Sequence, residues 1–351
     1  MTKCNENLTS STSEFDKKLQ SICFVATLYT FICVFVCSCV FSVSVLFLGS
    51  RWVKAFFVIY LIYFYYDSDA HWRGGRSGKW TEKLRNLKIW KHCANYFPVK
   101  LIKTTDLDPS SNYILCGFPH GLFAFGFASA FGANCTNCDD MFPGLEFRIL
   151  SLRLFFYVPF FRELALIFGG CSCSKESMQY LLSTKPQTQK QSRALILLVG
   201  GSDDAFRTRR GVYRIVLKNR KGFIRTALKN GTPLVPVFSF GEVDYYDIFH
   251  PKEGTLLHKI KNFSIKKFGL FPSIVIRGNI LKNFFSFKPI RTPIHVVVGS
   301  PIKVPKIENP IEEEVDEYHK IFIEKLIELF DSYKSTYMQI YNCGNITLNL
   351  V

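Results

Sequence analysis

The stretch Ile114–Gly126, ILCGFPHGLFAFG, decides the fold expected of this chain. It opens with a short apolar run that predicts a strand. Pro119 then fixes the backbone, Gly121 permits a close approach of substrate or chain, and the run from Leu122 predicts a helix whose first amides face the same place. Because α/β domains bind ligands where a strand ends before a helix begins, His120 lies at a predicted ligand site.

Short β-branched runs and helical patterns continue through the chain after about residue 85. The predicted strands are Tyr113–Gly117, Ala194–Val199, Leu234–Phe240, Ser273–Ile276 and Ile294–Val298. Apolar residues at helical spacing predict a helix over Gly222–Asn230, which Gly231 ends. Strands that alternate with helices indicate a mixed α/β domain.

A longer helix is predicted near the C-terminus. Asn309 suits its cap, Pro310 its first position and Glu312–Glu314 the positive end of the helix dipole. The residues that follow at steps of three and four form one apolar stripe, which predicts packing on the core. The stripe consists of Ile311, Val315, Tyr318, Phe322, Leu326, Leu329 and Tyr333.

The N-terminal part predicts a membrane segment. Ile22–Leu48 contains no charged residue and exceeds the roughly 20 residues that a helix needs to span the hydrocarbon core. A second apolar run, Ala55–Tyr66, follows at once and can be lengthened by Trp52 with Lys54 snorkelling. A secretory signal peptide fits poorly, because the first run is too long and has no small-residue cleavage site. We therefore expect a transmembrane helical hairpin over residues 21–66.

The flanking charges predict the orientation of this hairpin. Lys17 and Lys18 precede it, only Arg51 and Lys54 occupy its tip, and five basic residues follow it: Arg73, Arg76, Lys79, Lys83 and Arg85. The positive-inside rule then places both ends in the cytoplasm. The expected organisation is a cytosolic tail (1–20), the hairpin (21–66) and a cytosolic, membrane-associated domain (67–351).

The amino-acid composition limits the classes of partner that this chain is expected to bind. The net charge of +16 arises after Arg51, so the body is strongly basic and attracts acidic lipid headgroups, phosphorylated ligands or nucleic acid. Nucleic acid is the weaker interpretation, because no recognition module of the usual spacing appears. The 12 cysteines form no regular framework, which favours a reducing, cytosol-facing environment.

His120 has several possible roles. No second ligand falls near it at metal-binding spacing, and Cys135 and Cys138 form a lone CxxC, so no metal site is expected. The chain has no Gly-x-Ser-x-Gly elbow, which argues against a serine hydrolase. A general base that deprotonates a hydroxyl needs only an imidazole near its ordinary pKa within reach of the acceptor. A buried histidine bonded to a carbonyl remains an alternative.

Two later blocks also carry candidate residues. Gly200 and Gly201 follow a buried strand, at a turn where backbone can approach a ligand. A basic cluster could bind the phosphates of a ligand or could be a solvated or headgroup-contacting face. It consists of Arg207, Arg209, Arg210, Lys218, Arg220 and Lys221, and Gly222 at a helix start adds an amide dipole. Glu242, at the end of another strand, could line the site or serve as a structural hydrogen-bond partner.

Several long blocks together resemble the diacylglycerol acyltransferase 2 family, which includes monoacylglycerol and wax-alcohol acyltransferases. They are NYFPVKLIKTTDLDPSSNYILCGFPHG (95–121), MFPGLEFRILSL (141–152), VPFFRELALIFGG (158–170), LLVGGSDDAF (197–206), LKNRKGFIRTALKNGTPLVPVFSFGE (217–242) and HVVVGSPIKVPKIENP (295–310). The resemblance implies a glycerolipid-acyltransferase-like domain after the hairpin. LDPS and SKESMQYLL look closest to the monoacylglycerol branch.

The resemblance implies an integral membrane enzyme of the endoplasmic reticulum, or of lipid droplets, that transfers an acyl group from acyl-CoA to a mono- or diacylglycerol hydroxyl. Acyl-CoA is then a co-substrate and no cofactor or metal is expected. The implied partners are acyl-CoA, the acylglycerol and the lipid bilayer, with a homo-oligomer possible and no nucleic acid. The alternatives are a wax-alcohol acyltransferase and a lipid-binding pseudoenzyme.

The resemblance also assigns residues. His120 matches the second histidine of the family's His-Pro-His-Gly block and would be the general base, whereas Phe118 replaces the first histidine. Wider glycerolipid acyltransferases have an aspartate where this chain has Phe125. Asp204 matches a family glutamate and is the candidate orienting carboxylate, with Asp203 in reserve. The residues expected to bind substrate are Phe118, Pro119, Gly121, Gly200, Gly201, Arg220, Lys221, Gly222 and Glu242.

Overall fold

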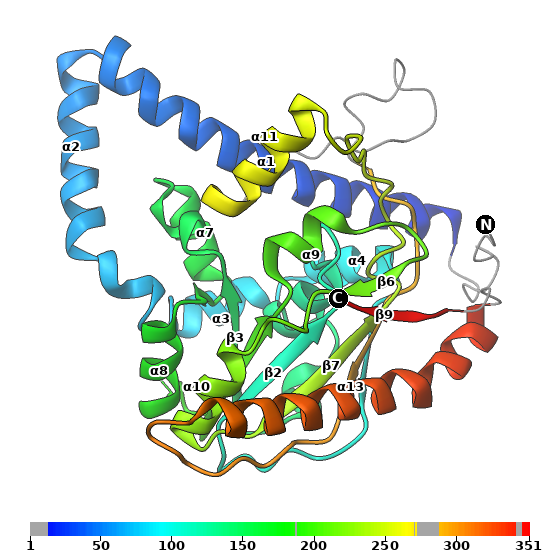
Figure 1. The fold of residues 1–351 in the computed structure, drawn as a ribbon. Coiled ribbons are helices and arrows are strands. Elements are labelled where there is room, and N and C mark those ends of the chain that lie inside the picture. Colours follow the sequence, from blue (N-terminus) through cyan, green and yellow to red (C-terminus); the bar gives the residue numbers. More distant parts are fainter. Residues whose placement is uncertain (1–12, 187, 270, 272–287, 342–345) are drawn as a thin grey trace.

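A seven-stranded sheet forms the centre of the protein in a computed structural model, which describes residues 13–186, 188–269, 271, 288–341 and 346–351 (Figure 1). The strand order is β1-β8-β7-β2-β5-β3-β4, and every neighbouring pair is parallel except β7 with β8. The strands are β1 (Lys100–Lys103), β2 (Tyr113–Phe118), β3 (Leu145–Ser151), β4 (Gly170–Ser172), β5 (Ser192–Leu198), β7 (Leu234–Phe240) and β8 (His295–Val298).

The predicted α/β class is confirmed, and the apolar runs locate the central strands. β2 and β7 are buried along their whole length, because helices cover both faces of a largely parallel sheet. β2, β5, β7 and β8 lie at or within two residues of their predicted bounds. The predicted strand at Ser273–Ile276 falls outside the described residues.

Helices pack in two layers on this sheet. One apolar cluster joins the sheet to α8 (Lys175–Ser183), α10 (Gly222–Asn230) and α13 (Glu312–Tyr341). The other cluster joins it to α1 (Glu14–Leu48), α4 (Lys88–Tyr96), α5 (Phe125–Phe127), η3 (Ala128–Gly132) and α6 (Cys138–Met141). The remaining elements are η2 (Ser68–His71), α3 (Lys79–Arg85), η4 (Arg153–Tyr157), α7 (Phe161–Ile167), α9 (Gly201–Arg207), α11 (Leu256–Phe268) and the parallel pair β6 (Tyr213–Ile215) and β9 (Leu348–Leu350).

The two predicted helices of the body are present. α10 has the predicted bounds, and Gly231 ends it in the left-handed conformation (φ 63°). α13 begins at Glu312, two residues later than its predicted first position, and the Ile311 amide donates to Glu314 Oε2 at 2.9 Å. Most of the predicted stripe packs on the core, but Ile311 precedes the helix and is 58% exposed.

The N-terminal helices differ from a closely packed hairpin. α1 and α2 (Arg51–Tyr66) meet at a short turn, and Figure 1 shows α2 leaving the end of α1 at an open angle. The first half of α1 packs on the body instead, where Phe24 stacks on Tyr96 with ring centroids 4.7 Å apart. Among the described residues, α1 is the one helix long and apolar enough to cross a membrane, by length and composition.

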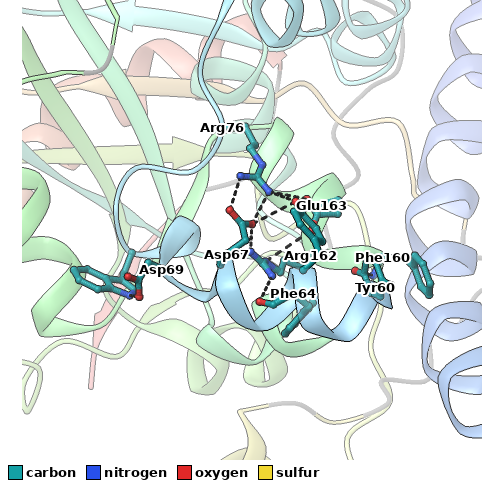
Figure 2. Close-up of polar contacts among 10 residues, drawn as sticks. Tyr60, Phe64, Asp67, Asp69, Arg76, Phe160, Arg162 and Glu163 are labelled. Atoms are coloured by element: carbon teal, nitrogen blue, oxygen red, sulfur yellow. Dashed lines mark hydrogen bonds and ion pairs between the residues drawn. The ribbon is translucent and has the colours of Figure 1, made fainter. Parts of the chain in front are cut away.

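A partly buried ionic joint, made by Asp67, Arg76, Arg162 and Glu163, attaches the end of α2 to α7 (Figure 2). The Arg162 guanidinium, 1% exposed, contacts the Asp67 carboxylate and donates to the Phe64 carbonyl at 3.0 Å. Arg76 bridges Asp67 and Glu163 at 2.6 and 3.1 Å. The two positive and two negative charges balance, so this joint fixes α2 to the body without a net buried charge.

Aromatic side chains extend the same joint along α2. The Tyr60 ring stacks on Phe160 with centroids 4.4 Å apart, and the Phe160 amide donates to the Tyr60 hydroxyl at 2.7 Å (Figure 2). A stacked pair with a hydrogen-bonded hydroxyl holds position more firmly than apolar contact alone. α2 therefore has a defined direction relative to the body.

Candidate active site

His120 lies two residues beyond β2, at the carboxyl end of a central strand and beside the start of α9. Gly121 adopts a left-handed conformation (φ 61°), and a Cβ there would meet the Glu242 carbonyl oxygen at 2.5 Å. Only glycine fits both constraints, so the turn after His120 is fixed by sterics. The predicted helix begins at Phe125, three residues later than expected, because Leu122–Ala124 form a turn first.

His120 is half-buried, and its imidazole is held by its own loop. Its Nδ1 lies 2.9 Å from the Gly121 carbonyl oxygen, a distance that fits an Nδ1–H donor. With its proton there, the ring carries its lone pair on Nε2. Burial lowers the pKa of His120, although the Gly121 carbonyl acts in the opposite direction. The ring is therefore neutral at physiological pH and able to accept a proton.

Asp204 meets His120 as predicted, but through the main chain. Its Oδ2 accepts a hydrogen bond from the His120 amide at 2.9 Å, whereas the ring bonds Gly121. Burial raises the pKa of Asp204 to about 6, although the His120 amide, the Val216 main chain and the nearby Arg214 charge act in the opposite direction. The expectation that this carboxylate orients the imidazole directly is therefore corrected: it positions the loop that carries the ring.

Glu242 is a structural partner of the same loop. Its carboxylate is fully buried and accepts from the Gly126 amide at 3.1 and 3.2 Å and from the Ser239 hydroxyl at 2.8 Å. Tyr245 adds a bond at 3.3 Å. Burial raises the pKa of Glu242 to about 7. These contacts make Glu242 a structural hydrogen-bond partner of the loop, and its role in binding substrate stays a prediction.

Phe118 is a core residue. It is fully buried within the cluster that α13 covers, and its ring centroid lies 6.1 Å from that of Phe322. Side chains alternate along a strand, so Phe118 faces the same side as Ile114 and Cys116, which belong to that cluster. Its packing supports a structural role, and its predicted part in substrate binding stays a prediction. Pro119 is buried as well, between this core residue and His120.

Aromatic rings pack together beside the loop of His120, around Phe125. Phe125 packs on Phe24 of α1 at 5.0 Å, on Phe97 at 5.4 Å and on Tyr245 at 5.2 Å between ring centroids. The Tyr245 hydroxyl also accepts from the Phe123 amide at 3.2 Å. α1 therefore contacts the loop of His120 through apolar rings.

The two predicted glycines after β5 border Asp204. A Cβ on Gly200 would meet the Asp204 Cβ at 2.4 Å, so that position requires glycine. Gly201 begins α9 in the left-handed conformation with open space around it. The turn thus lies next to the residue that holds His120. That these amides bind substrate stays a prediction.

The predicted basic residues are divided between two places. Arg220 is exposed just before α10, as is Gly222, the first residue of that helix. The Lys221 ammonium contacts the Asp316 carboxylate on α13. Arg207 pairs with Asp203 at 2.7 Å. No contact recorded for the described residues joins these groups to His120. Their role in binding a phosphorylated substrate therefore stays a prediction.

Two further residues of this region, Arg214 and Tyr245, were not predicted from the sequence. Arg214 is half-buried and close enough to Asp204 to stabilise its charge. Tyr245 bonds both Glu242 and the loop of His120. Neither lies in a recognisable motif, although Tyr245 follows Glu242 by three residues, a spacing compatible with a turn. Among the described residues, no group of three histidines, cysteines or carboxylates could hold a metal ion.

Comparison with known proteins identifies the class. The family model for diacylglycerol acyltransferase matches residues 44–345. Diacylglycerol O-acyltransferase 2 of Dictyostelium discoideum is 36% identical over 83% of this chain and 85% of its own length. Human acyl-CoA wax alcohol acyltransferase 2 is 38% identical over 80% of this chain and 82% of its own length. Human 2-acylglycerol O-acyltransferase 3 is 37% identical over 84% of this chain and 84% of its own length.

The chain therefore belongs to the diacylglycerol acyltransferase family and is an acyltransferase. Among solved structures, the 1-acyl-sn-glycerophosphate acyltransferase PlsC of Thermotoga maritima is similar over 90% of this chain and 97% of its own, at 14% identity with a TM-score of 0.38. That likeness is too distant to support a conclusion about the reaction.

Proposed function

We propose that this protein transfers a fatty acyl group from acyl-CoA to the hydroxyl of a mono- or diacylglycerol, with His120 as general base. The observation that carries the proposal is the geometry of His120: a neutral imidazole on a half-buried residue at a strand end, with its proton directed to the Gly121 carbonyl. Names of the relatives support the substrate class, because they include diacylglycerol, 2-acylglycerol and wax alcohol acyltransferases.

The reaction needs one proton transfer and one substitution. Nε2 of His120 takes the proton of the acceptor hydroxyl while its oxygen forms a bond to the thioester carbonyl carbon. The carbon–sulfur bond then breaks, and the departing CoA thiolate takes the proton from the imidazolium. Because a thiolate is a good leaving group, no acyl-enzyme is required. Main-chain amides after Gly121 or at Gly200–Gly201 are the proposed donors to the carbonyl oxygen.

The buried position of Phe118 favours an active enzyme over a pseudoenzyme. Its ring packs among core residues, so the missing first histidine removes no group from the surroundings of His120. A wax alcohol remains a second candidate acceptor, because the relatives include a wax alcohol acyltransferase at 38% identity.

The apolar N-terminal helices support a membrane location for this reaction. Acylglycerol and acyl chain both partition into lipid, so a site at the bilayer surface meets both substrates. We propose the endoplasmic reticulum or lipid droplets as the location, with both termini cytosolic, the membrane part within residues 21–66 and the acyltransferase domain within 67–351. The basic cluster around Arg220 is the proposed contact for the CoA phosphates.

Purified protein in nanodiscs should incorporate labelled acyl-CoA into diacylglycerol or triacylglycerol. His120→Ala should abolish incorporation, whereas His258→Ala, at a half-buried position on α11 where the ring bonds Asn262 of the same helix, should leave it near wild type. Full activity in His120→Ala would disprove the role of the base. A panel of monoacylglycerol, diacylglycerol and long-chain alcohol identifies the acceptor.

A further inference from the structure

α11 presents an apolar face that no described residue covers. Leu256 and Phe263 are 74% and 64% exposed, and Leu257, Ile260 and Phe268 are also exposed. Leu256, Ile260 and Phe263 follow one another at steps of four and three, so they form one line along the helix. An uncovered run of large apolar side chains indicates an interaction surface.

The opposite side of α11 is firmly attached, so the exposed face is not that of a frayed segment. Lys261 is 5% exposed, and its ammonium donates to the Phe206 carbonyl at 2.8 Å and lies 3.4 Å from His250 Nδ1. The Thr255 hydroxyl caps the first turn by accepting from the His258 amide at 3.3 Å. The helix thus buries a lysine and exposes leucines and phenylalanines, the reverse of what water favours.

The charges of α11 select a lipid surface. The helix contains Lys259, Lys261, Lys266 and Lys267 and no aspartate or glutamate. Helices with one apolar face and many lysines bind the boundary between acyl chains and anionic headgroups. A second copy of the protein is disfavoured as the covering partner, because a symmetric contact through α11 would bring the same lysines together.

α11 is also placed to share a membrane with the N-terminal helices. Figure 1 shows α11 and α1 on the same side of the body, away from α13. The second half of α1 and most of α2 expose apolar residues that include Val36, Val40, Leu46, Phe47, Trp52, Phe56, Ile59 and Ile62. Because the ionic joint of Figure 2 fixes α2 to the body, these surfaces keep their relative positions.

We propose that α11 is a membrane-surface helix that lies in the plane of the bilayer. Its line of Leu256, Ile260 and Phe263 inserts below the headgroups, and its exposed lysines meet anionic phospholipids; these are Lys259, Lys266 and Lys267. This is a membrane contact separate from α1 and α2, and it lies close to the site: Lys261 bonds the Phe206 carbonyl in α9, and α9 carries Asp204, which bonds the His120 amide. The contact would hold the catalytic loop against the leaflet.

A photo-crosslinking experiment tests this contact. The benzophenone analogue of phenylalanine replaces Phe263, or Phe56 on α2 as the positive control, or Lys325 on the exposed side of α13 as the negative control. The full-length chain is irradiated in nanodiscs that contain phosphatidylserine and phosphatidylcholine, and phospholipid adducts are measured by mass spectrometry. We expect a yield at position 263 close to that at 56 and roughly tenfold above that at 325.

A yield at position 263 no higher than at 325 would overturn the proposal, and so would adducts with a second copy of the chain. All three labelled proteins are also made with His120→Ala, so that lipid contact is measured without turnover. The proposed reaction can therefore fail while the membrane contact stands, and the converse also holds.

Activity provides a second readout of the same contact. Phe263→Glu places a negative charge in the inserted line, and Phe263→Leu is the matched apolar control. We expect Phe263→Glu to raise KM about tenfold for an acylglycerol in phosphatidylserine vesicles and to leave kcat in detergent micelles near wild type. Equal KM values for Phe263→Glu and Phe263→Leu on vesicles would contradict the proposed binding of α11 to the membrane.

Discussion

The carboxylate of Asp204 accepts a hydrogen bond from the main-chain amide of His120 at 2.9 Å, although 84 residues separate them in sequence. The imidazole itself bonds the next carbonyl, that of Gly121. The carboxylate and the ring are therefore connected through one residue of backbone. This arrangement makes Asp204 a positioning residue, and it separates the effect of its loss from the loss of the base.

Asp204→Ala should lower kcat more than it changes KM. The substitution leaves the buried His120 amide without an acceptor, which costs about 1–3 kcal/mol and loosens the loop. Asp203→Ala is the matched control, because the neighbouring carboxylate pairs with Arg207 at a more exposed position. Rates of acyl transfer from labelled acyl-CoA measure both variants. Equal kcat values in the two variants would show that the amide bond has no part in positioning.

Acyl transfer should be lost on acidification, because only neutral His120 accepts a proton. Burial lowers the pKa of His120 below its ordinary 6.5, so the active form persists down to that lowered value and disappears below it. The acid limb of kcat/KM against pH should therefore have its inflection below 6.5.

Asp204 adds a second effect in the same range, because its pKa is raised to about 6 and protonation weakens its bond to the His120 amide. Asp204→Asn removes that contribution and should leave a limb from His120 alone. If the acid limb of kcat/KM for Asp204→Asn had its inflection above pH 6.5, a group other than His120 would control the rate.

Glu146 should be essential for stability, although it lies away from His120. It binds the guanidiniums of Arg148 and Arg193, each at 2.8 Å, and all three side chains are buried. Burial, followed by the charge of Arg148, lowers the pKa of the nearby Arg85 to about 10, whereas the charge of Glu146 acts in the opposite direction. Glu146→Gln leaves two buried guanidiniums without a counter-charge.

The expected loss for Glu146→Gln is about 3–5 kcal/mol, the usual result of breaking a buried pair on one side. Thermal unfolding in detergent measures it. Asp106→Asn, which breaks an exposed pair with Lys103, should leave the melting temperature unchanged. If Glu146→Gln and Asp106→Asn have the same melting temperature, the buried ion pairs of Glu146 contribute no more to stability than an exposed ion pair does.

The same cluster shows what sequence patterns could not predict. β2, β5 and β7 were predicted because each contains a short, predominantly apolar run, and the bounds of α10 follow from its spacing and from Gly231. β3 was missed although Leu145, Phe147 and Ile149 alternate with Glu146 and Arg148, because the strands were predicted only from predominantly apolar runs. Its two charged residues predict a solvent-facing side, whereas they are buried with Arg193, far along the chain. Long-range charge pairing leaves no local signal.

At the site, the sequence identified His120 and Asp204 but not how they meet. Whether a carboxylate bonds a ring or an amide depends on the exact position of the backbone that carries the ring, and the spacing of residues in the sequence does not determine that position. Phe118 is different, since strand alternation from Ile114 and Cys116 already places it on the core side. The family pattern made its replacement look functional, whereas the packing makes it structural.

Phe118→His should therefore lower stability without raising the rate. The new imidazole would enter an apolar cluster beside Phe322, where an unpaired polar group costs about 1–3 kcal/mol. Phe118→Leu, the matched apolar control, should keep the wild-type rate with a smaller stability loss. Acyl transfer in nanodiscs and melting temperature in detergent measure both variants. A large gain in kcat for Phe118→His, absent in Phe118→Leu, would show that position 118 reaches the reacting groups and that the wild-type chain is catalytically impaired.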